Sequence, residues 1–122
     1  MSIAVELQEL AERVAEYGPV AFLITTGDDG APHLVSTAVA LTDDGALVVR
    51  IGRTTTANAT ARPRVTMMWS PVAARPEYCL IVDGNATVDP DGCRIQPDRA
   101  VLHRMADATG DGPGCITVLD AR

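Results

Sequence analysis

The segment IGRTTTANATARPRV, residues 51–65, gathers side chains suited to binding an anion. Together with Arg50 directly before it, the segment holds four of the ten basic residues in a lysine-free chain whose formal net charge is −6. Guanidinium groups bind phosphate through paired hydrogen bonds, threonine hydroxyls add single ones, and a helix N-terminus adds oriented N–H groups. If residues 55–61 form one or two helical turns, the segment supplies all three. Threonines also cap helices and arginines also coat surfaces, so the residues alone leave a phosphate site and a solvated segment both open.

The composition narrows the classes of function. A chain of 122 residues fits one compact domain, which we expect to span residues 1–122. The acidic balance argues against nucleic acid and anionic membranes as partners. The sequence has no signal peptide and no apolar run of membrane-spanning length, which predicts a cytoplasmic protein. The three cysteines form no CxxC pair, and we expect them to be reduced and without a role; no metal site is expected.

The elements that would position the arginines are mostly strands. Acidic turns ending in glycine, at residues 27–30 and 42–45, separate apolar runs and predict hairpins. Gly84, inside a long strand, predicts a bulge or bend. The pattern is typical of a mainly β fold, a small antiparallel β-barrel with a few helices. We expect helices over 2–17, capped by Ser2, and over 97–109, and strands over 20–26, 32–41, 46–51, 64–70, 77–89, 93–95 and 115–120.

Alternation within two strands predicts which side chains share a face. In the strand 32–41, one face carries Val35, Thr37, Val39 and Leu41. The opposite face carries mostly small side chains, those of Leu34, Ser36, Ala38 and Ala40. A face of this kind suits a flat ligand or another packed element. In the strand 64–70, Met67 and Trp69 both point inward and predict core packing.

The order of these elements resembles the pyridoxamine 5'-phosphate oxidase-like, FMN-binding split-barrel family. The likeness covers roughly residues 5–89 and rests on VVRIGRTTTANATARPRVTMMW and CLIVDGNATV, in that order. It implies a homodimer with FMN at the subunit interface and a small-molecule oxidoreductase activity. The family pattern places the FMN phosphate at Arg50, Arg53, Thr54, Thr55 and Thr56, with Arg62 and Arg64 close behind. It places the flavin ring near His33, Val35, Ser36 and Thr37, with Tyr78 and Cys79 approaching from later strands.

Two departures from the family keep alternatives open. Threonines stand where many members have a lysine at the phosphate, and the chain ends soon after CITVLDAR, without the arginine-bearing arm that contacts pyridoxamine phosphate. One alternative is a reductase that uses a deazaflavin coenzyme (factor 420), whose acidic tail would need a basic groove. The other is a cofactor-free dimeric binding module on the same barrel. The arginines that could line such a groove are Arg75, Arg94, Arg99 and Arg104.

The sequence predicts no catalytic residue, because in flavin chemistry the cofactor carries the hydride and the protein supplies binding and orientation. His33 opens a strand and either faces the ring or is partly exposed. His103 and Asp107 are four residues apart in the expected second helix, which favours a surface pair over a site.

Overall fold

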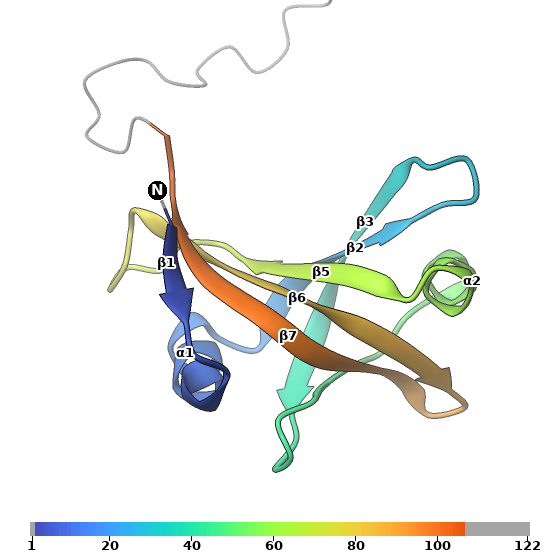
Figure 1. Ribbon diagram of the computed structural model, residues 1–122, viewed down its shortest axis with the longest axis horizontal. Coiled ribbons are helices and arrows are strands. Elements are labelled where there is room, and N and C mark those ends of the chain that lie inside the picture. Colours follow the sequence, from blue (N-terminus) through green and yellow to red (C-terminus); the bar gives the residue numbers. More distant parts are fainter. Residues whose placement is uncertain (1, 107–122) are drawn as a thin grey trace, which may run out of the picture.

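The hairpin of β2 (Val20–Thr26) and β3 (Pro32–Leu41) is the first part of the barrel, and it has the bounds that the sequence predicts. Its turn uses Gly30 at a positive φ of 83°, and the carboxylate of Asp29 accepts a hydrogen bond from the N–H of Ala31. The computed structural model describes residues 2–106. Figure 1 shows this hairpin extending beside the helix α2 (Arg53–Ala61).

Antiparallel pairing closes the sheet into a six-stranded barrel. The strand order is β1-β7-β4-β3-β2-β5-β6, and a further pairing of β6 with β7 completes the ring, with β1 added outside it along β7. The predicted barrel is therefore confirmed. The remaining elements are β1 (Ser2–Val5), the 3-10 turn η1 (Leu7–Glu9), α1 (Leu10–Tyr17), β4 (Leu47–Val49), α2 (Arg53–Ala61), β5 (Arg64–Trp69), β6 (Tyr78–Asp89) and β7 (Gly92–Arg104).

The core fills the barrel with aliphatic side chains around one indole. Trp69 is fully buried and donates a hydrogen bond from Nε1 to the carbonyl oxygen of Gly18, 3.0 Å away; Met67 is also fully buried, as predicted. Helix α1 packs against the barrel through Leu10, Val14 and Tyr17. The two helices lie on opposite sides of the molecule, α1 near β1 and α2 beside β5 and the β2–β3 hairpin (Figure 1). Among residues 2–106, no helix has the length and apolar character needed to cross a bilayer.

The first predicted helix begins too early. Residues 2–5 form β1, whose register runs from Ser2 opposite His103 to Val5 opposite Ala100, so Ser2 caps no helix. The α-helix starts only at Leu10. The exposed backbone edge of β7 offers a full set of ladder hydrogen bonds to these residues, and the β-branched Ile3 and Val5 suit a strand.

The second predicted helix, over 97–109, is wrong for every residue that the structure describes. The chain there is part of β7, which pairs with β6 from Gly92 to Arg104 and also takes up the predicted short strand 93–95. This long pairing overrides the helix-like spacing of Val101 and Met105. His103 therefore lies on a strand, and its expected partner Asp107, like the strand expected over 115–120, lies outside the described residues.

The bend predicted at Gly84 is confirmed. The β6–β7 register shifts there: Asp83 lies opposite Arg99, whereas Gly84 lies opposite Pro97. A Cβ atom on Gly84 would overlap the carbonyl oxygen of Gln96, so only glycine lets the two strands approach this closely. The irregularity also explains how a proline is accommodated inside a strand, because a bulge leaves one backbone group without a ladder partner.

Candidate functional site

The arginine and threonine segment leaves the barrel at the end of β4 and turns into α2. The predicted helix is confirmed and starts at Arg53, two residues earlier than expected. Gly52 is the N-cap, and within residues 2–106 no side chain caps the first turn, so its N–H groups are not used by a capping residue there. Such N–H groups, together with the positive end of the helix dipole, favour an anion.

Arg50 and Arg53 stand on either side of this helix start, and both are exposed. Within residues 2–106, they are the two arginines for which neither an ion pair nor a side-chain hydrogen bond is found. Arg62 instead donates from Nε to the carbonyl oxygen of Thr26 at 2.7 Å, and Arg64 forms a two-pronged pair with Asp98. Of the four arginines of the segment, the two near the helix start thus have no partner among the described residues, whereas the two near its end are each engaged by one.

The threonines contribute less to this surface than their number indicates. Thr55 is 2% exposed, on the underside of α2. The hydroxyl of Thr56 donates a 2.7 Å hydrogen bond to the carbonyl oxygen of Gly52, one turn earlier in the chain. Thr54 is exposed, and no partner is found for its hydroxyl among the described residues. Of the three threonine hydroxyls predicted to bind phosphate, that of Thr54 therefore remains as a candidate.

The four predicted ring residues on β3 are divided between two faces. Thr37 is buried, and His33 and Val35 are half-buried on the same inward face, whereas Ser36 is exposed on the outer face. Thr37 links this strand to the arginine segment, because its hydroxyl donates to the carbonyl oxygen of Arg50 at 3.0 Å. The predicted alternation of β3 is confirmed, and the small-sided face is exposed in the described chain.

A hollow beside the arginine segment adds residues that the sequence analysis missed. Arg50, Ile51 and Thr56 line a cavity of about 480 Å³ together with the β6–β7 turn, residues 88–92. That turn brings in Asp89 and Asp91, and the N–H of Asp91 bonds the carboxylate of Asp89 at 2.9 Å. The sequence PDG, residues 90–92, is typical of a turn, and nothing in the local sequence shows that this turn faces Arg50.

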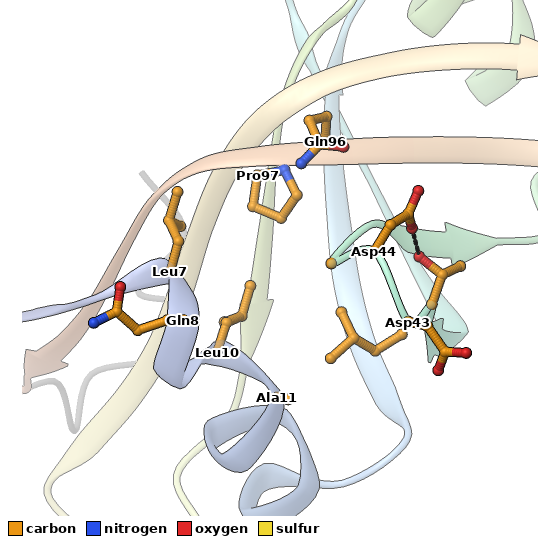
Figure 2. A pocket seen from close by; sticks show the side chains of 11 residues that line it. Leu7, Gln8, Leu10, Ala11, Asp43, Asp44, Gln96 and Pro97 are labelled. Atoms are coloured by element: carbon orange, nitrogen blue, oxygen red, sulfur yellow. Dashed lines mark hydrogen bonds between the residues drawn. The ribbon is translucent and has the colours of Figure 1, made fainter.

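A second hollow, of about 410 Å³, lies between α1 and the β3–β4 turn (Figure 2). Its wall is aliphatic, with Leu7 and Leu10 pointing toward Pro97, and Asp44 on its rim is engaged by the hydroxyl of Thr42. None of the residues predicted to bind phosphate or ring lines it. It therefore has no connection to the arginine segment.

The arginines considered for a basic groove are all neutralised. Each forms an ion pair with a carboxylate of the same chain. The described residues therefore offer no continuous free basic groove. The pairs are Arg75 with Glu16, Arg94 with Asp44, Arg99 with Asp83 and Arg104 with Glu77.

No nucleophile or metal centre is apparent in the described part of the chain. Burial raises the pKa of the Cys79 thiol and that of the Cys93 thiol above the ordinary value, so both remain protonated at neutral pH. Residues 2–106 hold no group of three or more histidine, cysteine or acidic side chains placed to bind a metal ion. Among the described residues, the arginines and N–H groups at the start of α2 are suited to binding an anion.

Comparison with known proteins identifies the fold. Neither a family model nor a curated protein matches the sequence. An FAD-binding protein from Mesorhizobium loti superimposes with a TM-score of 0.65 at 16% identity, over 84% of this chain and 95% of that one. A putative pyridoxamine 5'-phosphate oxidase from Listeria innocua gives 0.63 at 18% identity, over 80% and 98%. The heme storage protein HutZ of Vibrio cholerae gives 0.60 at 15%, over 82% and 96%. At these identities the likeness concerns the fold, which is the split barrel that the motifs predicted.

Proposed function

Because the described chain has the split-barrel fold of pyridoxamine 5'-phosphate oxidase-like proteins, we propose that it binds FMN and acts as an oxidoreductase on a small molecule. One observation carries the proposal: Arg50 and Arg53, alone among the arginines of residues 2–106, lack an internal partner, and they flank the uncapped start of α2. Leaving two guanidinium groups free at a helix N-terminus, while the other described arginines are engaged, suits a phosphate ligand.

The residues of the chain would divide the work of binding as follows. Arg53 and the first-turn N–H groups of α2 hold the phosphate, Arg50 approaches it from the end of β4, and the hydroxyl of Thr54 adds one hydrogen bond. We place the ring along β3 near Ser36, the predicted ring residue whose side chain is exposed on the outer face. When bound, the flavin supplies the hydride-transfer chemistry, and the chain supplies orientation and shielding from water.

The outer face of β2, β3, β5 and β6 supports a homodimer. One outward-facing row of side chains crosses these four strands in register. It consists of Ser36 on β3, Phe22 on β2, Met68 on β5 and Ile81 on β6. Leu34 is 59% exposed and Val20 60% exposed on the same side. An exposed apolar patch of this kind marks an association surface. We propose that a second copy covers this face and that the flavin lies where the two copies meet.

FMN is favoured over a deazaflavin coenzyme by the pairing of the other arginines. A long acidic tail needs several free cations, and the four arginines that would serve are each held by a carboxylate. We also propose a cytoplasmic location, where the free thiols of Cys79 and Cys93 stay reduced.

The test is a comparison of FMN and riboflavin, which differ only by the phosphate. Dissociation constants are measured by quenching of Trp69 or of flavin fluorescence in wild type, Arg50→Ala, Arg53→Ala and the control Arg94→Ala, whose guanidinium pairs with Asp44. We expect each site variant to weaken FMN about tenfold or more, because it loses a charge-assisted hydrogen bond, and to leave riboflavin unchanged. The control removes the same charge without removing a phosphate contact. A wild-type protein that retains no flavin would leave the cofactor-free module as the better description.

A further inference from the structure

Helix α2 is held on the barrel mainly by polar contacts. Of its nine residues, the buried ones are Thr55, Asn58 and Ala59, and only alanine among them is apolar. Threonine and asparagine are poor helix formers, and a helix this short is marginal without tertiary support. Because the buried side of the helix has so little apolar surface, specific hydrogen bonds determine the position of the helix on the barrel.

Two such bonds fasten α2 to consecutive residues of β2. The side-chain amide of Asn58 donates from Nδ2 to the hydroxyl oxygen of Thr25, 3.1 Å away, and the two residues are 6% and 1% exposed. Arg62 donates from Nε to the carbonyl oxygen of Thr26 at 2.7 Å. The backbone joins the two contacts, because the N–H of Arg62 bonds the carbonyl oxygen of Asn58 at 2.8 Å. The last turn of α2 is thereby fixed in both rotation and position.

We propose that Asn58 is a positioning residue for the phosphate group of the cofactor, acting through its hydrogen bond to Thr25. Asn58 is five residues after Arg53, which places the two about 140° apart around the helix axis. This agrees with a buried Asn58 and an exposed Arg53. A rotation of α2 that frees Asn58 turns Arg53 and the first-turn N–H groups by the same angle. The inference rests on the proposed function, because it assigns a role in binding FMN phosphate.

The experiment compares single and double replacements of the buried pair. Thr25→Val keeps the shape and removes the acceptor, Asn58→Leu removes the donor, and the double variant removes both without leaving a buried group unpaired. Thr25→Ser keeps the hydroxyl and is the conservative control. Thr60→Ala is the control on the helix itself, because the exposed hydroxyl of Thr60 donates to the carbonyl oxygen of Thr56 and, within residues 2–106, makes no contact with the barrel. Dissociation constants for FMN and riboflavin, and the urea midpoint, are measured for each.

We expect Thr25→Val, Asn58→Leu and the double variant to lose about tenfold in FMN affinity with riboflavin affinity unchanged. Thr25→Ser and Thr60→Ala should bind both like wild type. The double variant decides the matter, because it should regain stability without regaining FMN affinity. Recovery of both, or equal weakening of FMN and riboflavin, would show that the pair serves stability alone and would overturn the inference. A wild-type protein with no preference for FMN over riboflavin would instead overturn the proposed function, and the inference with it.

Discussion

The hydroxyl of Thr37 donates a 3.0 Å hydrogen bond to the carbonyl oxygen of Arg50 and so ties the middle of β3 to the chain that leads into α2. The last backbone pair between β3 and β4 is Val39 with Val49. The contact of Thr37 with Arg50 therefore joins β3 to the chain after the end of β4. Thr37 is 8% exposed, which excludes most water from the bond. The backbone that carries Arg50 is therefore fixed by a buried side chain rather than by sheet pairing.

Replacing Thr37 by valine should loosen this connection at nearly constant volume. The carbonyl oxygen of Arg50 would lose its partner, and we expect the free energy of unfolding to fall by about 1 kcal/mol in urea titrations. Thr37→Ser retains the hydroxyl and should lose less. If the Thr37→Val variant is as stable as wild type, the carbonyl oxygen of Arg50 is hydrogen-bonded to water in the variant. The bond from Thr37 then does not hold the segment that leads into α2.

Gly84→Ala should be among the most destabilising small substitutions in the chain. The added Cβ would overlap the carbonyl oxygen of Gln96, and backbone on both strands must move to relieve the clash. We expect a loss of about 2 kcal/mol or more in the free energy of unfolding, measured by urea titration. Gly52→Ala is the matched control, since a Cβ there meets nothing within 4 Å and φ is −86°. A loss below about 1 kcal/mol is expected for it, from the N-cap position. Equal losses at the two glycines would contradict the clash.

Local chemistry explains why part of the fold was predictable. Acidic turns ending in glycine and strict alternation determine β2 and β3, and both strands end where the sequence predicts. The segment 97–109 shows the limit, because Pro97 and the spacing of Val101 and Met105 resemble a helix start and stripe. Its strand state depends on β6, which is a distant partner that no local window contains.

The candidate site shows a similar division. The clustering of Arg50, Arg53, Arg62 and Arg64 is visible in the sequence, and so is the helix that follows Gly52. Which arginines remain free is decided by neighbours distant in the chain, such as Asp98 for Arg64 and the carbonyl of Thr26 for Arg62. The spacing of residues in the sequence does not predict such pairings. They distinguish Arg50 and Arg53, the candidate anion ligands, from the other two arginines, which have structural contacts.

Leu34→Arg should separate the proposed dimer into monomers. Leu34 is 59% exposed on the outer face of β3, and a charge buried between two copies there would lack a partner. Sedimentation equilibrium should report a dimer for wild type and a monomer for the variant, with the urea midpoint of the monomer still measurable. Leu7→Arg, on η1 and 46% exposed, is the matched control and should remain dimeric. A wild-type monomer at every concentration would rule out the outer face as a self-association surface.

The pair of Arg64 with Asp98 should make a small, pH-dependent contribution to stability. It joins the first residue of β5 to the irregular part of β7, with Nη2 of Arg64 at 2.9 Å from Oδ1 of Asp98. The hydrogen bond from Arg64 holds the pKa of the Asp98 carboxyl below its ordinary value. A carboxyl whose pKa is lower in the folded than in the unfolded state stabilises the fold above the unfolded value, about 3.9. That stabilisation is lost as the pH falls through the folded value. Urea midpoints of wild type and Asp98→Asn should therefore differ at neutral pH and converge in acid, where the wild-type carboxyl is also neutral. A difference that persists unchanged at about pH 2 would mean that Asp98 acts through packing or backbone geometry and not through its charge.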